Sequence, residues 1–191
     1  MSFCTHTDEV KMKDVLIVGD GPAGLSAALL LAKNDLDAAV FGTDDTPMHK
    51  ALLLNYLGIP ELAGSEFQAI AREQVQSFGA ELNDVKVSDL AKTDEGFSVT
   101  TENGDTIEGR YLVLATTNKN HLDALGVDRS DDGTAAADRN CRTNIGGCYA
   151  VGWAARKDKI QAIISAGDGA VAALDILSRQ RGEPFHDFDV V

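Results

Sequence analysis

The chain has 191 residues, enough for one domain with a substantial core and short for two. A net charge of −13 argues against nucleic acid and anionic membranes as partners. Because the acidic residues are scattered along the chain, we interpret the charge as halophilic adaptation rather than as a docking face for a basic partner. Three cysteines without a CxxC pair, and the lack of an apolar leader or membrane-length segment, predict a cytoplasmic protein.

The first part of the chain predicts a βαβ unit. Residues 1–13 are polar and are expected to form a flexible N-terminal tail. Residues 14–18 are apolar and mostly β-branched, which predicts a buried strand, and a glycine-rich sequence follows at 19–24. A helical pattern at 25–33 and a second strand at 38–41 complete a unit of the expected length.

The middle of the chain predicts a long loop and then a helix. Residues 42–61 have no clear periodicity, and long loops in compact domains are usually functional or disordered. The helix is expected to start at Ser65, because Ser65 and Gln68 have capping-box spacing, and to stop at Gly79.

Short alternating segments then predict a small antiparallel meander. They cover residues 85–90, 97–101 and 106–108, with an Asn-Gly turn signal at 103–104. A further buried strand is expected at 111–115.

The last part of the chain begins with a polar, turn-rich stretch over 118–144. A strand at 148–151, a helix at 160–179 and a C-terminal tail at 182–191 follow. The helix offers five apolar residues to the core: Ile160, Ile163, Ile164, Val171 and Leu174. Together, the elements predict an α/β fold: a single Rossmann-like domain over 14–181, with a parallel sheet, helices and a small antiparallel β-meander.

The glycine-rich sequence has the pattern of a dinucleotide-binding loop. Gly19 would allow the tight turn, Gly21 would let the backbone approach a pyrophosphate, and Gly24 would let the helix pack on the strand. Pro22 and Ala23 would lie in the first helical turn, whose free N–H groups favour an anion. The alternative is a glycine turn that binds no ligand.

The acidic residue that such folds use to hold the adenosine ribose is missing from its usual place. The end of the second strand is Gly42, and Asp44 or Asp45 either substitutes for the acid or is an ordinary loop residue. Asp20, inside the glycine loop, either points outward or helps to cap the helix.

Five further segments determine a family resemblance. In order they read NYLGIPE with GSEF, REQVQSFGAE, LATT, GCYAVG and QAIISAGDGA, at residues 55–61 with 64–67, 72–81, 114–117, 147–152 and 161–170. In this order they resemble the FAD domain of low-molecular-weight thioredoxin reductases over residues 14–178.

The resemblance implies FAD as cofactor. It implies these binding residues: Gly19, Gly21, Pro22, Ala23, Gly24, Asp44, Asn55, Val85, Ala115, Thr116, Gly152, Trp153, Gln161 and Ala162. Asn55 would lie near the flavin and Val85 near the adenine. The N–H groups at the start of the last helix, Gln161 and Ala162, would point toward the pyrimidine edge of the flavin.

The departures from the family pattern are equally informative. Residues 118–144 are too few for the NADPH-binding domain that the family carries at this place, and the chain has no second GxGxxG and no CxxC. The chain is therefore not expected to be a complete thioredoxin reductase. Thr117 replaces a family glycine, and Trp153 replaces an aspartate that holds the ribityl chain. Trp153 either substitutes for that contact or fills the flavin's place.

Two classes of function follow. The first is an FAD-dependent oxidoreductase that receives electrons from a separate donor: a small redox protein, free NAD(P)H, or a partner subunit. The resemblance also implies a homodimer. The alternative is a degenerate, non-catalytic protein that binds a flavin or nucleotide or serves as a dimer scaffold, and a third hypothesis is one half of a split enzyme.

The cysteines and histidines give no catalytic or metal site. Cys141 and Cys148 are either a redox relay near the flavin or, as we favour, two small buried hydrophobic residues. Cys4 and His6 are too few ligands for a metal. The other histidines are expected at the surface: His49, His121 and His186.

Overall fold

The computed structural model describes residues 12–190, so most of the expected N-terminal tail, including Cys4 and His6, lies outside the described residues. The elements are β1 (Lys13–Val18), α1 (Pro22–Lys33), β2 (Ala38–Gly42), η1 (Pro47–Lys50), β3 (Leu52–Leu53), β4 (Leu62–Ala63), α2 (Gly64–Ser77), β5 (Glu81–Asp84), β6 (Val87–Lys92), β7 (Phe97–Thr101), β8 (Thr106–Leu114), α3 (Lys119–Leu125), β9 (Cys148–Ala150), η2 (Gly152–Ala154) and α4 (Ala162–Arg181).

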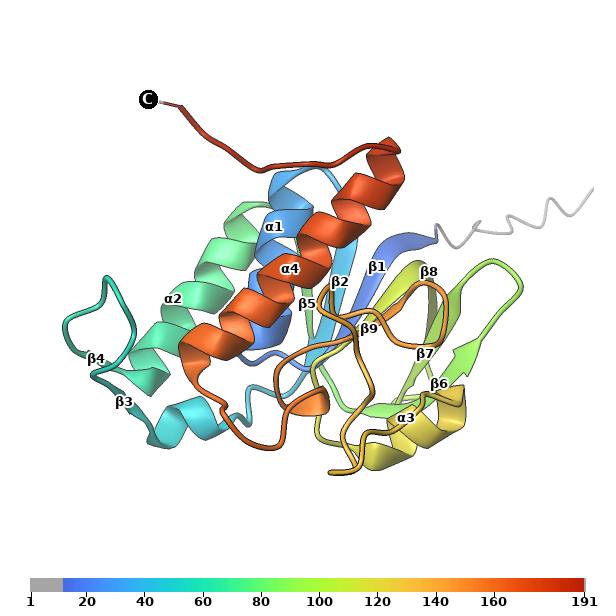
Figure 1. Cartoon of the computed structure of the whole chain (residues 1–191), viewed down its shortest axis with the longest axis horizontal. Coiled ribbons are helices and arrows are strands. Elements are labelled where there is room, and N and C mark those ends of the chain that lie inside the picture. Colours follow the sequence, from blue (N-terminus) through green and yellow to red (C-terminus); the bar gives the residue numbers. More distant parts are fainter. Residues whose placement is uncertain (1–11, 191) are drawn as a thin grey trace, which may run out of the picture.

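The main sheet confirms the predicted α/β class. Strands β5, β2, β1, β8 and β9 are parallel neighbours in that order, while β8, β7 and β6 form the antiparallel meander. Strand β8 belongs to both parts: its first half pairs with β7 and its second half with β1 and β9. Helices α1, α2 and α4 lie together on one side of the sheet, and α3 lies by the meander (Figure 1).

Two cores follow from the alternation of side chains along β1. Val15 and Ile17 face α1 and α4, whereas Leu16 and Val18 face the meander and α3. The first three are fully buried and Val18 nearly so, and burying side chains of this size stabilises the fold by about 1.5–3 kcal/mol each.

Small residues let α1 and α4 approach closely. A Cβ at Gly169 of α4 would overlap the carbonyl oxygen of Ala23 in α1. The predicted buried face of α4 is wrong, since Val171 is exposed and Ile163, Ile164 and Leu174 are only partly buried. Ile160, also only partly buried, precedes the helix. The buried residues of α4 are Ser165, Asp168, Gly169, Ala172, Ala173, Ile176 and Leu177.

Helix α2 begins without the expected capping box. Its N-cap is Ala63, and no side chain among the described residues caps it. Gln68 is instead fully buried, and its Nε2 donates to the Asp20 carbonyl oxygen at 2.6 Å. The expected stop is confirmed, because Gly79 follows the helix with φ +93°, where glycine is favoured.

The sequence patterns missed one strand of the main sheet and one helix, besides the short elements η1, β3, β4 and η2. Strand β5 has the polar sequence Glu-Leu-Asn-Asp and adds to the edge of the sheet beside β2. Helix α3 lies inside the stretch predicted to be only turns, and Asn118 Oδ1 caps it by accepting from the Asn120 N–H at 3.1 Å. Between α3 and β9 the chain forms turns and isolated bridges.

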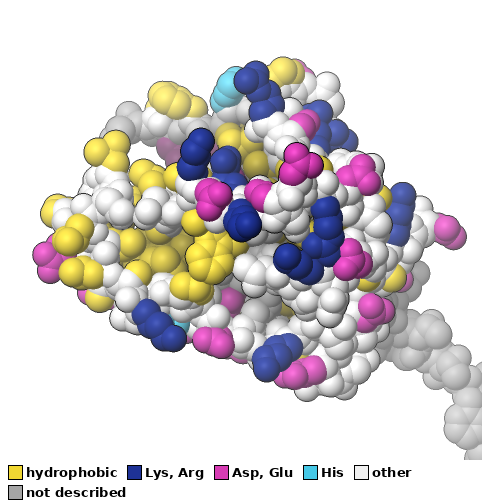
Figure 2. Space-filling view, turned by 60° about the horizontal axis from the view of Figure 1, so that its bottom comes forward, with side chains coloured by type: hydrophobic (Ala, Val, Ile, Leu, Met, Phe, Trp, Pro, Cys, Tyr) yellow, Lys and Arg dark blue, Asp and Glu magenta, His cyan; other side chains and the backbone are white. Residues whose placement is uncertain are grey.

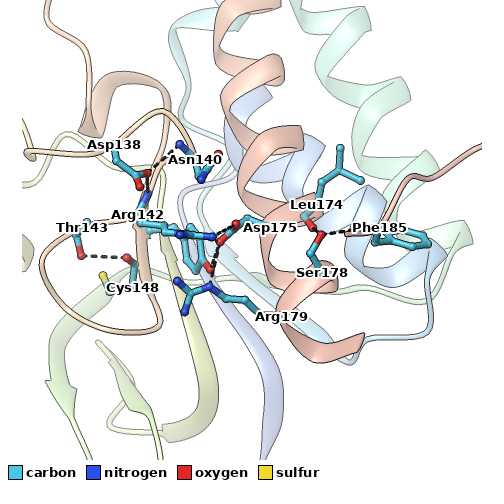
Figure 3. A network of polar contacts seen from close by, with 11 residues as sticks. Asp138, Asn140, Arg142, Thr143, Cys148, Leu174, Asp175, Ser178, Arg179 and Phe185 are labelled. Atoms are coloured by element: carbon cyan, nitrogen blue, oxygen red, sulfur yellow. Dashed lines mark hydrogen bonds and ion pairs between the residues drawn. The ribbon is translucent and has the colours of Figure 1, made fainter. Parts of the chain in front are cut away.

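Asp175 of α4 ties the segment before β9 to the helix (Figure 3). Its carboxylate accepts from Arg142 Nε at 2.8 Å, from the Tyr149 hydroxyl at 2.7 Å and from Arg179 Nε at 3.2 Å. The Arg142 Nη2 completes a two-pronged ion pair with the same carboxylate. These contacts hold the pKa of Asp175 below its usual value, although burial opposes the shift.

The segment after α4 has no regular secondary structure in its described part but is attached to the body. Phe185 packs on the first core, with the Arg181 guanidinium 3.8 Å from the centre of its ring. Lys33 Nζ contacts Asp187 at 2.8 Å and Asp189 at 2.6 Å. Within residues 12–190, no helix combines the length and the apolar character that a membrane crossing needs.

Candidate functional site

A cleft of about 680 Å³ opens at the carboxyl ends of the parallel strands. Val18 at the end of β1, Phe41 and Gly42 at the end of β2, and Ala115 just after β8 line it. This is the place where open α/β sheets bind ligands. Figure 2 turns this end of the molecule toward the viewer and shows a broad apolar area on it.

The glycine loop has the geometry that its sequence predicts. Gly19 adopts φ +112° and a Cβ there would overlap the Ala115 carbonyl, while a Cβ at Gly24 would overlap the Gly19 carbonyl oxygen. Gly21 lines the cleft, and a Cβ there would meet no described atom within 4 Å. The tight turn and the close packing therefore require Gly19 and Gly24, whereas Gly21 leaves open space toward the cleft.

A second helix N-terminus borders the same cleft. Helix α4 begins at Ala162, two residues later than predicted, so Gln161 is its N-cap and not a helical residue. Both residues line the cleft. Asn55 lies beside them, because its Nδ2 donates to Gln161 Oε1 at 3.0 Å.

The structure brings together most of the residues predicted to bind a cofactor. The cleft is lined by Gly19, Gly21, Pro22, Ala23, Val85, Ala115, Thr116, Trp153, Gln161 and Ala162. Four others lie outside its lining: Gly24, Asp44, Asn55 and Gly152. Gly24 packs against the Gly19 carbonyl oxygen, and the Gly152 N–H donates to Asp168. Asn55 contacts the cleft residue Gln161, and the Asp44 carboxylate lies 3.2 Å from His49 Nε2.

Asp20 occupies the space beside Gly42 instead of pointing outward or capping α1. A Cβ at Gly42 would overlap the Asp20 carboxylate. The Asp20 Oδ2 accepts from the Asp44 N–H and from Arg72 Nη1, both at 2.8 Å, and Arg72 also pairs with Asp84. Both sequence-based alternatives for Asp20 are therefore wrong, and no sequence signal marked Arg72 as its partner.

Arg72 stays charged in this arrangement. Burial lowers the pKa of its guanidinium, but the hydrogen bond to Asp84 and the charges of Asp20 and Asp44 raise the pKa above its ordinary value. The carboxylate of the glycine loop thus lies in an ion pair with Arg72 and is not an isolated negative charge.

Trp153 forms a wall of the cleft. Its side chain is 47% exposed and also borders a neighbouring cavity of about 350 Å³. The 680 Å³ of the main cleft remain with the indole in place, so Trp153 does not fill the cleft. The turn that carries it is fixed by Asp168 of α4, which accepts from the Gly152 N–H at 3.2 Å and from Arg156 Nε at 2.6 Å.

His121 is not a surface residue, which corrects the sequence-based expectation. It is 6% exposed, lines the cleft from α3, and lies 3.1 Å from Asn118 Nδ2 through its Nε2. Burial lowers the pKa of its imidazole, and the Val87 backbone and the Asp89 charge only partly oppose this. The other two described histidines, His49 and His186, are exposed as expected.

The two described cysteines are buried thiols. Cys141 is 7% exposed, with Sγ 3.6 Å from the Asp168 carbonyl oxygen, and Cys148 is 1% exposed. Burial raises the pKa of each thiol to about 12. Both are therefore protonated at neutral pH, which favours the interpretation as small core residues over that of a redox relay.

The fold is Rossmann-like, with a cleft at the carboxyl ends of its parallel strands, and comparison with known proteins identifies the family. The family profile described as pyridine nucleotide-disulphide oxidoreductase matches residues 58–170. The chain belongs to this family.

The relatives agree with the resemblance found in the sequence. A component of the alkyl hydroperoxide reductase of Staphylococcus aureus is 33% identical over 110 residues, which is 54% of this chain and 21% of that protein. The thioredoxin reductase tcpT of Claviceps purpurea is 37% identical over 111 residues, which is 54% of this chain and 34% of that protein. The chain thus matches only a fifth to a third of the length of these relatives.

Solved structures support the fold. A thioredoxin reductase from Gloeobacter violaceus superposes with a TM-score of 0.83 at 18% identity, covering 94% of this chain and 98% of that one. The predicted resemblance to low-molecular-weight thioredoxin reductases is thereby confirmed.

The cleft fits the dinucleotide that the family typically binds. Its volume lies in the range of cofactor pockets, about 300–1,000 Å³. Thr46 Oγ1 lines it and has no hydrogen-bond partner among residues 12–190, although it is buried. The open face of Gly21 gives a phosphate room to reach the backbone.

Proposed function

We propose that this protein binds FAD in the cleft and serves as an oxidoreductase that receives electrons from a separate donor. The observation that carries the proposal is the convergence of two helix N-termini, those of α1 and α4, on one cleft that Gly21 leaves open. Each N-terminus carries a partial positive charge suited to a negatively charged group.

The residues divide the cleft into three regions. The Gly19–Ala23 loop would hold the pyrophosphate, and Val85 would lie near the adenine. The flavin would lie by Gln161 and Ala162, with Asn55 fixing the Gln161 side chain. Bound FAD would supply the redox chemistry, and the start of α4 would favour negative charge on the pyrimidine edge.

The electron donor would be a separate molecule. Residues 118–147, at the place where the family's nicotinamide-binding domain belongs, contain α3, turns and isolated bridges, and no βαβ unit. The two described thiols are buried and protonated, so they do not form a ready dithiol. A small redox protein, free reduced NAD(P)H or a partner subunit would then reach the flavin through the open side of the cleft.

Exposed apolar side chains support a homodimer as part of the proposal. The β3–β4 region presents Leu52, Leu54 and Leu57, which are 57%, 64% and 89% exposed. Ile70 of α2 and Phe78, just after that helix, are also largely exposed. Apolar side chains grouped in this way commonly mark an interface.

The visible absorption spectrum of the purified protein tests FAD binding. Flavin bands, or quenching of Trp153 fluorescence on titration with FAD, would support the proposal. Gly21→Val should abolish retention because its side chain projects into the cleft. Gly146→Val is the matched control, since a Cβ at Gly146 also meets open space but lies outside the cleft lining.

The absence of FAD binding would exclude the oxidoreductase, whereas reduction of the bound flavin by a separate electron donor distinguishes the oxidoreductase from a non-catalytic flavin-binding protein. A wild-type protein that leaves saturating FAD unbound would refute the proposal and favour the non-catalytic scaffold. Equal FAD retention in Gly21→Val and the wild type would remove the glycine loop from the site.

A further inference from the structure

The acid that Rossmann-like folds place at the end of the second strand has a counterpart here from a different element. That strand end is Gly42, and its Cβ position is occupied by the carboxylate of Asp20. Resting on the proposed function, we infer that Asp20 accepts a hydrogen bond from an adenosine ribose hydroxyl of the bound dinucleotide, in place of an acid at the end of β2.

The carboxylate of Asp20 lies at the carboxyl ends of the parallel strands, and one of its oxygens is free to accept a hydrogen bond from a ligand. Asp20 lines the cleft between the glycine loop and the end of β2. Its Oδ2 is used by the Asp44 N–H and Arg72 Nη1. Its Oδ1 takes no hydrogen bond from any of the residues 12–190, and a carboxylate oxygen can accept two. A ribose hydroxyl supplies the donor that Oδ1 lacks.

The surroundings hold this carboxylate in place. Asp20 is 6% exposed, and Gln68 Nε2 fixes its backbone carbonyl. Arg72 pairs with it from α2 and also binds Asp84, just beyond the cleft. Because Arg72 offsets part of its charge, the Asp20 carboxylate can lie near a pyrophosphate at a smaller electrostatic cost than an unpaired acid would have.

The two acids that follow Gly42 are less suited to the role. The Asp44 carboxylate lies 3.2 Å from His49 Nε2, outside the cleft lining. Asp45 lines the cleft but is exposed, so water competes for its oxygens. A nearly buried, pre-positioned carboxylate gives a hydroxyl more binding energy than a solvated one.

The arrangement also explains why β2 ends in glycine. Any side chain at Gly42 would displace the Asp20 carboxylate, so the chain can carry the acid at one of the two positions but not at both. The glycine at position 42 therefore leaves room for the Asp20 carboxylate, and its presence does not mean that the ribose contact is lost.

The test measures FAD affinity by fluorescence titration for the wild type, Asp20→Asn and Asp45→Asn. Each protein is also titrated with an FAD analogue built on 2′,3′-dideoxyadenosine. A hydrogen bond to a charged group predicts that Asp20→Asn weakens FAD binding about tenfold or more. Removing the hydroxyls should weaken wild-type binding by a similar factor and should leave Asp20→Asn within about twofold.

Asp45→Asn is the matched control, because it removes the same charge from the same cleft. It should bind FAD nearly as the wild type does and should still distinguish FAD from the analogue. A loss in Asp45→Asn equal to that in Asp20→Asn would overturn the inference in favour of a general charge effect.

The remaining outcomes separate this inference from the proposed function. A wild-type protein that binds FAD and the analogue equally overturns the inference alone, and this comparison needs no variant to fold. The inference alone is also overturned if the wild type and Asp20→Asn bind the analogue more weakly than FAD by the same factor. A wild-type protein that takes up no FAD refutes the proposed function itself, and this inference with it.

Discussion

Replacing Asp175 by Asn tests whether the polar network of Figure 3 stabilises the fold. The substitution keeps the shape but removes the charge that Arg142, Tyr149 and Arg179 share. Hydrogen bonds to a buried charge contribute about 1.5–3 kcal/mol each. Arg142 and Arg179 are more than a third exposed, so solvent screens their share strongly. We therefore expect a total loss of about 2 kcal/mol.

The assay is urea unfolding followed by circular dichroism, with thermal unfolding in parallel. For a domain of this size a loss of about 2 kcal/mol lowers Tm by roughly 4–8 °C. Tyr149→Phe should lose less, about 1 kcal/mol, because only one neutral donor is removed. Combined with Asp175→Asn it should cost less than the sum, since the two side chains share one hydrogen bond.

A charge control and the pH dependence make the prediction falsifiable. Asp131→Asn removes a charge from an exposed loop and should change stability by less than about 0.5 kcal/mol. The pKa of Asp175 is lowered by folding, so between its folded pKa and about 3.9 the unfolded chain binds more protons. Wild-type stability should then fall more steeply than that of Asp175→Asn as pH drops through this window. Equal stability of Asp175→Asn and the wild type at pH 7 would refute the reasoning.

Two more predictions follow from the buried titratable groups. Because the pKa values of Cys141 and Cys148 are about 12, both thiols should resist iodoacetamide at pH 8 in the folded protein and should react in urea. Peptide mass mapping measures the labelling, and rapid labelling of either thiol in the folded protein would contradict the prediction. Folding lowers the pKa of His121, so its contribution to stability is present above about pH 6.5 and is lost as pH falls through the folded pKa. His121→Gln should flatten the Tm profile below about pH 6.5, and an unchanged slope would show that His121 is not the titrating group.

Periodic apolar patterns in the sequence predicted the elements that are held together by burial of apolar side chains. The strand–glycine loop–helix unit at β1 and α1 was predictable because burial and backbone geometry there depend on local sequence. Strand β5 was not, because its polar residues lie at a sheet edge, where pairing and not burial makes the strand. The buried face of α4 was misjudged for a related reason: close helix packing selects small residues such as Gly169, which a hydrophobic pattern overlooks.

In the candidate site, too, features that depend on local sequence were predicted, and features that depend on tertiary packing were not. The sequence indicated the loop Gly19–Gly24 and the start of α4, and in the structure Gly19–Ala23, Gln161 and Ala162 line one cleft. It did not indicate that Asp20 fills the space at Gly42, which the pairing of β1 with β2 brings beside it. Nor did it indicate that Arg72 holds Asp20 there, because Arg72 is distant in the chain and meets Asp20 only through the packing of α2. His121 was likewise assigned to the surface, because α3 itself was not predicted.

The parallel pairing of β8 with β9 has a consequence for how this scaffold can be rebuilt. The chain leaves β8 after Leu114 and returns at Cys148, which pairs with Leu112 in the neighbouring strand. Exit and return are therefore separated by about two residues along the strand and one strand spacing, roughly 8 Å. Loop-closure entropy rises slowly with length, so the stretch between them can lengthen greatly at little cost to the sheet. The connection between β8 and β9 is therefore a suitable site for inserting a domain. A domain whose two ends lie close together can be inserted there without removing a strand from the cleft or from either core.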